Sequence, residues 1–212
     1  MRDFVTRSLT IARSTSRRST PEPGFKLLRP GHPPKTLTMV LWITGVSGAG
    51  KTTLSNALAQ LLKPHFPQMV VVDGDVVRQF FGNDLDYSEA SRRIQIQRLQ
   101  RLAAWLERQG CIAVVAALYA HPDLLAWNRS HFDEYFEIYI DAPKTLVALR
   151  DTKGLYKAAA EGRMKHVVGV DIPWHAPQEP DFVVDAGAQE RPDMTARRIA
   201  AAVPRLAAAL KV

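Results

Sequence analysis

The stretch that decides the fold is GVSGAGKTT, residues 45–53. It matches the pattern G-x-x-x-x-G-K-[ST], with both fixed glycines, Lys51 and Thr52 in place. Residues 39–44 before it are apolar and partly β-branched, which predicts a buried strand. Residues 54–62 after it carry apolar side chains at helical spacing. The sequence therefore predicts a strand, a glycine-rich turn and a helix, in the order that a phosphate-binding loop requires.

These residue types suit nucleotide phosphates. Glycines allow a turn in which backbone N–H groups point at phosphate oxygens, helped by the positive end of the helix dipole. Lys51 can reach the β- and γ-phosphates, and the Thr52 hydroxyl can bind Mg²⁺. We therefore expect ATP and Mg²⁺ here, with nucleotide contacts from Gly45, Ser47, Gly48, Ala49, Gly50, Lys51, Thr52 and Thr53. The alternative is a glycine-rich loop that only turns the chain.

The composition indicates one domain behind a basic N-terminal segment. The 212 residues are 46% hydrophobic, which is enough for a sizeable core. No apolar run reaches the roughly 18 residues that cross a bilayer, so we expect no membrane partner. Residues 1–38 hold eight Lys/Arg and two Asp/Glu, which gives +6 of the net +7 and leaves +1 for residues 39–212. A near-neutral domain without a basic stripe predicts no nucleic-acid partner.

The segment 1–38 is rich in Arg, Ser, Thr and Pro, and we expect it to be disordered. Its first twenty residues carry several arginines and a single acid, Asp3, which is typical of an organellar transit peptide. Alternatively, Met39 is the natural start and the segment is a wrongly assigned extension. We prefer the second interpretation, with a cytoplasmic protein. Cys111 is the only cysteine, which excludes an intramolecular disulfide, and its strand-like surroundings predict a buried thiol.

Two carboxylates follow the second predicted strand. Residues 69–72 are apolar, and Asp73-Gly74-Asp75 comes directly after them. Because ligands bind beyond the carboxyl ends of parallel strands, both acids should face the nucleotide phosphates. We expect Asp73 to bind Mg²⁺ and support catalysis, and Asp75 to accept a proton from a substrate hydroxyl. The alternative is that Asp75 only caps a helix that begins at Val76.

Further segments complete a predicted fold. We expect more strands at residues 111–117, 136–140 and 182–185, and helices at residues 88–108, 122–131, 143–150 and 192–210. The resulting architecture is a three-layer α/β domain of the P-loop type. It has a mainly parallel five-stranded sheet, helices on both faces and a lid near residues 152–170.

Several motifs together resemble the adenylylsulfate kinase family. These are GVSGAGKTT, DGDVVR at 73–78, KGLYK at 153–157 and GVDIP at 169–173, within a likeness that covers roughly residues 39–186. The resemblance implies a kinase domain over residues 39–212 that transfers the γ-phosphoryl group of ATP to the 3′-hydroxyl of adenylyl sulfate, giving 3′-phosphoadenylyl sulfate for sulfate assimilation. It also implies a homodimer.

The resemblance assigns roles to matching residues. Arg78 and Arg92 would hold the anionic groups of the substrate, which guanidinium forks do well, although an isolated arginine on a helix is otherwise a solvated surface residue. Tyr87 would pack against the substrate adenine, with core packing as the alternative. Lys153 would act from the lid as a catalytic and substrate-binding cation. The same resemblance implies that Arg150 binds the nucleotide and that Leu155 contacts the substrate.

Three departures from the family pattern concern the acceptor. Gln95 stands where the family has a substrate-binding Asn, and Gln97 replaces an Arg nearby. A Ser-Pro pair is replaced by residues 118–122, in which His121 is either an acid/base group or a solvated side chain. Val167-Val168 replaces a Phe-Thr pair whose ring gates the substrate base. A kinase of another activated nucleotide, such as cytidine diphosphoramidate, is therefore one alternative, and a non-catalytic nucleotide-binding regulator is another.

Overall fold

The computed structural model describes residues 37–151 and 154–211. Most of the expected tail, residues 1–36, lies outside the described residues, and so does Lys153. The division of the chain at residue 38 stays a prediction. In the part of the chain that the structure describes, no helix is long and apolar enough to cross a membrane.

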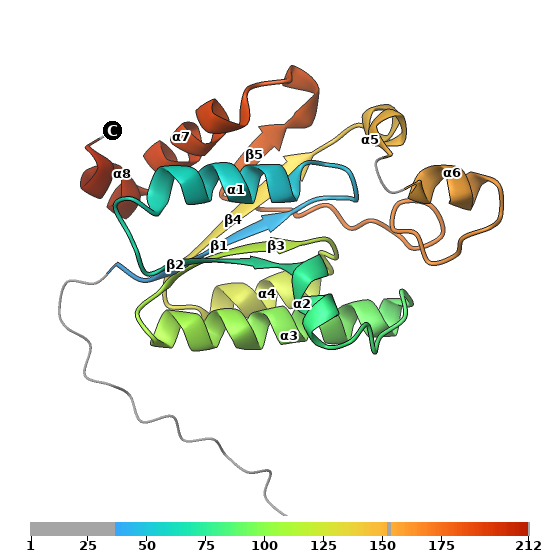
Figure 1. The fold of residues 1–212 in the computed structure, drawn as a ribbon, viewed down its shortest axis with the longest axis horizontal. Helices are drawn as coiled ribbons and strands as arrows, with labels where there is room; N and C mark the ends of the chain where they lie inside the picture. Colours follow the sequence, from blue (N-terminus) through green and yellow to red (C-terminus); the bar gives the residue numbers. More distant parts are fainter. Residues whose placement is uncertain (1–36, 152–153, 212) are drawn as a thin grey trace, which may run out of the picture.

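A parallel sheet forms the middle layer (Figure 1). Its five strands have the order β2-β3-β1-β4-β5, and every neighbouring pair is parallel. The predicted fold class is therefore confirmed. All six residues of β1 are buried, as expected for a strand that helices cover on both faces. The strands are β1 (Met39–Thr44), β2 (Met69–Asp73), β3 (Ile112–Ala117), β4 (Tyr135–Asp141) and β5 (Phe182–Asp185).

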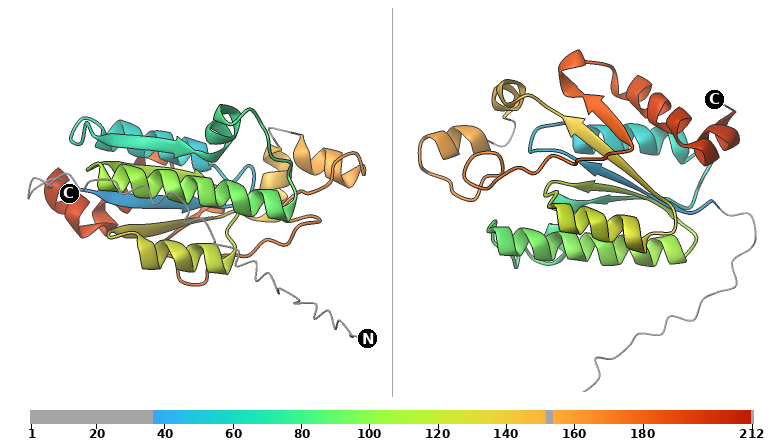
Figure 2. Two further views of the ribbon diagram at one scale, coloured as in Figure 1. Left: turned by 90° about the horizontal axis from the view of Figure 1, so that it is seen from below. Right: turned by 180° about the vertical axis from the view of Figure 1, so that it is seen from behind.

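Two groups of helices cover the sheet (Figures 1 and 2). On one face lie α1 (Lys51–Leu62), α7 (Pro192–Ala202) and α8 (Pro204–Leu210). The other face carries α2 (Gly74–Phe80), α3 (Glu89–Arg108) and α4 (Pro122–His131). Two short helices, α5 (Lys144–Arg150) and α6 (Leu155–Ala160), follow β4 at the carboxyl edge of the sheet. This edge is where ligands bind in open α/β folds.

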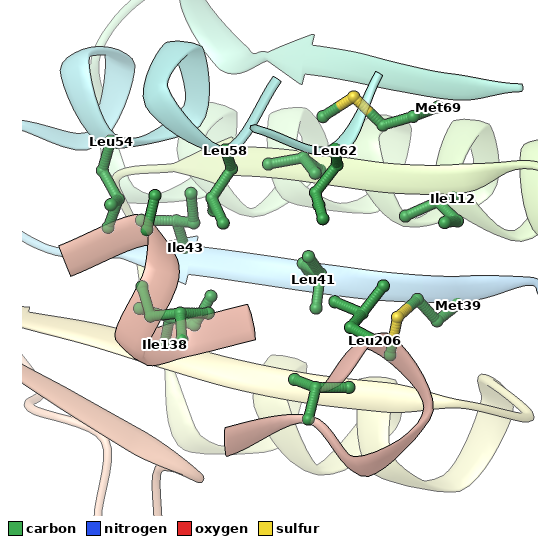
Figure 3. Packing of buried hydrophobic residues seen from close by; sticks show 14 of the residues in the cluster. Met39, Leu41, Ile43, Leu54, Leu58, Leu62, Met69, Ile112, Ile138 and Leu206 are labelled. Carbon is green, nitrogen blue, oxygen red and sulfur yellow. The ribbon is translucent and has the colours of Figure 1, made fainter. Parts of the chain in front are cut away.

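Alternating side chains of the central strands build one core on each face. Leu41 and Ile43 of β1 pack with Leu58 and Leu62 of α1 in the first core, with Leu206 of α8 in the same cluster (Figure 3). Trp42 points the other way and belongs to a second core under α3 and α4. The period of two along β1 thus divides its side chains between the two helical layers.

Several predicted element boundaries were wrong. The helix expected at residues 192–210 is broken at Pro204, because proline cannot donate the helical hydrogen bond and its ring blocks the preceding turn. The third strand begins at Ile112, one residue later than expected, and Cys111 is only half-buried. Burial nevertheless raises the pKa of the Cys111 thiol. The helix expected from Val76 begins at Gly74.

Candidate active site

The turn between β1 and α1 has the conformation that the motif predicts. Gly48 has a φ of 77° and Gly50 a φ of 107°, a region that L-residues enter only with strain. At Gly45 a Cβ would lie 3.0 Å from the carbonyl oxygen of Ile140, so glycine permits a close approach to β4. Gly50 precedes α1 directly, so the first N–H groups of this helix are presented at the end of the turn.

Lys51 and Thr52 occupy the first turn of α1. The Nζ of Lys51 donates hydrogen bonds to the carbonyl oxygens of Gly45 and Val46, each at 2.8 Å. The Oγ1 of Thr52 donates to Oδ2 of Asp73 at 2.8 Å. The hydroxyl and the carboxylate predicted to bind Mg²⁺ therefore lie together, although 21 residues separate them in the sequence.

Asp73 also determines how α2 begins. Its Oδ1 accepts a hydrogen bond from the backbone N–H of Asp75 at 2.8 Å, which makes Asp73 the N-cap. The alternative that Asp75 caps a helix starting at Val76 is thus wrong. Asp75 instead lies in the first turn of α2, near the positive end of the helix dipole.

Two buried arginines lie beyond these carboxylates. Arg78 is 7% exposed, and its Nη1 donates to the carbonyl oxygens of Leu85 and Asp86 at 2.9 and 3.1 Å. Arg92 is 9% exposed. Burial, reinforced by the charge of Arg78, lowers the pKa of Arg92. The interpretation of both as solvated surface residues is therefore wrong, and two guanidinium groups form an electropositive wall.

Tyr87 and a segment of the lid complete this wall. The guanidinium carbons of Arg78 and Arg92 lie 4.8 and 5.6 Å from the centroid of the Tyr87 ring. Tyr87 is 56% exposed, so its alternative role in core packing is wrong. Arg92 also donates from Nη2 to the carbonyl oxygen of His166 at 2.7 Å, which ties α3 to the lid.

Gln95 has an unusual environment next to the two carboxylates. Its side chain is buried, and Nε2 donates to the carbonyl oxygen of Gly74 at 2.9 Å. That contact fixes the orientation of the amide, because the reverse orientation would oppose two oxygens. The other amide atom, Oε1, is buried and finds no hydrogen-bond partner among residues 37–151 and 154–211.

The lid is anchored at both sides of its short helix. The Asp151 carboxylate accepts hydrogen bonds from the backbone N–H groups of Tyr156 and Lys157 at 3.2 and 3.0 Å. The hydroxyl of Tyr156 donates to the carbonyl oxygen of Ser47 at 3.0 Å, which joins α6 to the phosphate-binding turn. Asp171 accepts from two further backbone N–H groups, those of His166 and Val167, which closes the turn after the lid.

One cavity of about 660 Å³ unites these groups. Among the predicted site residues it is lined by Ser47, Gly48, Ala49, Gly50, Lys51, Thr52, Thr53, Asp73, Asp75, Arg78, Tyr87, Arg92, Gln95, Arg150 and Leu155. Gly45 does not line it and acts through the backbone geometry described above. His121 does not line it either and pairs instead with Asp123, which leaves it no acid/base role in this cavity.

Several lining residues were not predicted as site residues, and two groups of them lie at strand exits. Tyr119, at the exit of β3, is buried beside Leu118, and its hydroxyl donates to Glu89. Burial, together with this carboxylate, raises the pKa of Tyr119 to about 12. The second group follows β5 and includes Gln189, Glu190 and Thr195. The available signal was the position of this group after the carboxyl end of β5, because ligands in open α/β sheets bind beyond the carboxyl ends of the strands.

Known proteins agree with this geometry. Residues 37–185 match the family model described as adenylylsulphate kinase. The adenylyl-sulfate kinase of Synechococcus sp. (strain JA-2-3B'a(2-13)) is 36% identical over 155 residues, which cover 73% of this chain and 89% of that protein. The adenylyl-sulfate kinase of Bacillus velezensis is 34% identical over 167 residues, covering 78% of this chain and 85% of that protein.

A solved structure shows the same relationship. The Mycobacterium tuberculosis APS kinase CysC, in complex with AMPPNP and APS, superimposes with a TM-score of 0.72 at 28% sequence identity. The match covers 79% of this chain and 98% of that one. The motif likeness, the parallel fold and the sequence relatives therefore lead to one conclusion: this chain belongs to the adenylyl-sulfate kinase family of P-loop phosphotransferases.

Proposed function

We propose that this kinase transfers the γ-phosphoryl group of ATP to the 3′-hydroxyl of adenylyl sulfate within the 660 Å³ cavity. The observation that carries the proposal is the continuity of this cavity. It joins the phosphate-binding turn at Lys51 to the buried arginines Arg78 and Arg92, with Asp73 and Asp75 between them. One space thus offers a triphosphate site, a carboxylate pair and a second anion site in sequence along its length.

The phosphate end would hold ATP through the N–H groups of the turn, with the Lys51 ammonium against the β- and γ-phosphates. Thr52 and Asp73 would hold Mg²⁺, since a hydroxyl and a carboxylate 2.8 Å apart are the oxygen ligands this ion takes in kinases. When bound, the ion supplies charge neutralisation at the phosphates. Within the described residues, no cluster of three or more His, Cys, Asp or Glu could hold a metal alone. Thr52 and Asp73 would supply two protein oxygens, and Mg²⁺ in kinase sites takes further ligands from water and substrate phosphates.

Asp75 would accept the proton from the acceptor hydroxyl. The cap at Asp73 uses one carboxylate for structure and metal binding, which leaves Asp75 as the carboxylate for chemistry. Its place in the first turn of α2 sets its side chain at the cavity, where a general base for the acceptor hydroxyl is needed. Lys153 would add positive charge over the transferring group from the lid, whose flanks Asp151 and Tyr156 anchor.

The acceptor end would bind the sulfate and phosphate groups through Arg78 and Arg92, with Tyr87 and Leu155 against the nucleotide. The buried amide of Gln95 gives a specific reason to expect a ligand donor at this end. Within the described residues Oε1 is a buried acceptor without a partner, which costs about 1–3 kcal/mol, so a hydroxyl or amino donor of the ligand would be stabilising there if ligand binding uncovers this atom. Because Gly74 fixes the amide next to Asp75, that donor lies close to the reacting hydroxyl.

The test is a coupled assay for ADP release from Mg·ATP by the full chain, with adenylyl sulfate or cytidine diphosphate derivatives as acceptors. We expect turnover at low micromolar adenylyl sulfate and none with the cytidine compounds. Turnover confined to a cytidine compound would keep the phosphate end and overturn the acceptor. Absence of ATP consumption with every acceptor would favour the regulatory alternative.

The quaternary state and location extend this proposal. We propose a homodimer in the cytoplasm, as the family likeness implies. Large apolar side chains exposed on α2, Phe80 at 84% above all, give a surface that a second copy could cover. Light scattering on the purified chain measures the mass directly, and a mass of 23.6 kDa would refute the dimer.

A further inference from the structure

The turn that follows β5 lies next to α5 in the ribbon (Figure 1), and its residues line the cavity described above. It comprises the 3₁₀ helix Ala186–Ala188 and the residues that lead into α7. The family model ends at residue 185, so this turn lies beyond the matched part of the chain. Arg150, at the C-terminal end of α5, lines the same cavity as Ala186 and Glu190. The turn therefore lines the cavity, although the family motifs assign it no role.

The Glu190 side chain is held in place by two donors. Thr195 donates from Oγ1 to Oε2 of Glu190 at 2.9 Å, and Arg198 donates from Nη1 to the same oxygen at 2.9 Å. Thr195 is 4% exposed and sits in the first turns of α7, so its hydroxyl is a rigid support. Oε2 is thereby occupied. Oε1 accepts no hydrogen bond within the described residues and belongs to a side chain that lines the cavity.

The layout of the cavity determines which ligand group reaches Glu190. This step rests on the proposed function, in which Arg78 and Arg92 take the acceptor at one end and Lys51 takes the triphosphate in the middle. The donor base then occupies the remaining end, between Arg150 and the turn after β5. An ionised carboxylate only accepts hydrogen bonds. It suits an exocyclic amino group and repels a carbonyl oxygen at the same position.

We propose that Glu190 determines the donor base, with Oε1 accepting a hydrogen bond from the 6-amino group of adenine. Guanine and hypoxanthine carry a carbonyl oxygen at that position. Its partial negative charge is repelled by the negative charge of the Glu190 carboxylate. The competing explanation is that Glu190 only organises the start of α7 through Thr195 and Arg198. That explanation predicts lower stability for a Glu190 variant and no change in base preference.

The test measures binding without any acceptor. Full-length protein is titrated calorimetrically with Mg·ATP, Mg·ITP and the Mg complex of purine riboside triphosphate, which lacks the amino group. Wild type should bind ATP about tenfold tighter than either analogue, as expected for one hydrogen bond to a charged group. In Glu190→Gln, the amide oxygen stays with Thr195 and Arg198, and the NH₂ group turns to the base. The preference for ATP over ITP should then fall by about tenfold or reverse.

Asp193→Asn is the matched control. It removes a nearby carboxylate that pairs with Arg191 and does not line the cavity, so its ratio of ATP to ITP affinity should equal that of wild type. Equal wild-type affinities for ATP and ITP would overturn the proposal, and so would a Glu190→Gln variant of lowered Tm with an unchanged ratio. If that variant does not fold, Glu190→Asp, which keeps the charge and shortens the side chain, should show the same loss of preference, and an unchanged ratio in a folded Glu190→Asp variant would overturn the proposal. A failure of adenylyl sulfate turnover refutes the proposed function and leaves this ratio measurable.

Discussion

The phosphate end of the cavity is made of consecutive residues, 45–53, whereas the acceptor end is assembled from four separate segments: α2, α3, the exit of β3 and the lid. At the phosphate end the ligand meets backbone N–H groups whose direction follows from positive φ angles at Gly48 and Gly50. At the acceptor end it meets side chains such as Arg92 and Gln95, whose directions depend on partners far away in the sequence. Replacing those glycines would distort the whole backbone site, whereas a site made of side chains can be altered residue by residue.

The largest effect is expected at the phosphate end. Lys51→Ala removes the one side chain of the turn that reaches the β- and γ-phosphates, so kcat/KM for ATP should fall by about 10³-fold. Lys63→Ala, at the other exposed end of α1, is the control and should retain wild-type activity. Steady-state kinetics with adenylyl sulfate measure both. Near-native turnover by Lys51→Ala would contradict the assignment of the loop.

Asp75 lies where the two ends meet, and Asp75→Asn should lower kcat by about 10²-fold because the amide cannot take the proton. The affinity for Mg·ATP should stay unchanged, because Thr52 and Asp73 are intact. Asp73→Asn serves as the comparison, since it should weaken Mg²⁺ binding while the amide still caps α2. If the two variants showed the same dependence of rate on Mg²⁺ concentration, the division of roles between the two carboxylates would be wrong.

Gln95→Met tests the acceptor end alone. The variant keeps the length of the side chain and loses both hydrogen-bonding atoms, so the KM for adenylyl sulfate should rise by about tenfold while the KM for ATP is unchanged. Gln97→Met, on the exposed side of α3, is the matched control. An equal rise in both Michaelis constants would show that Gln95 supports the phosphate end through Gly74 and does not contact the acceptor.

The smallest effect is expected at Val167, which lines the cavity and is buried. Val167→Phe would add a ring beside the acceptor base and should lower the KM for adenylyl sulfate by about fivefold. The added volume also costs about 1–3 kcal/mol in packing, so Tm must be measured alongside. Val170→Phe, at an exposed position outside the cavity, controls for added apolar surface. An unchanged KM in a folded variant would mean that Val167 does not face the base.

Particular residues show where prediction from the sequence succeeded and where it failed. The strand, turn and helix around residues 45–53 were predictable because one glycine pattern sets both φ and the start of α1. That Thr52 and Asp73 would lie near each other was predictable, because the carboxyl ends of parallel strands meet at one edge of the sheet. The alternative in which Asp75 caps the helix was wrong, since Asp-Gly-Asp offers two capping side chains and only the backbone geometry distinguishes them. Pro204 was overlooked inside a helical pattern that it breaks.

By itself, the sequence determined the P-loop domain and its phosphate chemistry. The reason is that consecutive residues form this backbone site, so a short local motif specifies it. Only the tertiary structure decided which side chains share the cavity with it. This packing determines the burial of Arg78 and the contact of Arg92 with His166 across 74 residues. It also leaves the Gln95 oxygen without a partner among the described residues and holds the Glu190 carboxylate against Thr195. The strand order β2-β3-β1-β4-β5 brings these segments to one edge, and no local pattern encodes such long-range contacts.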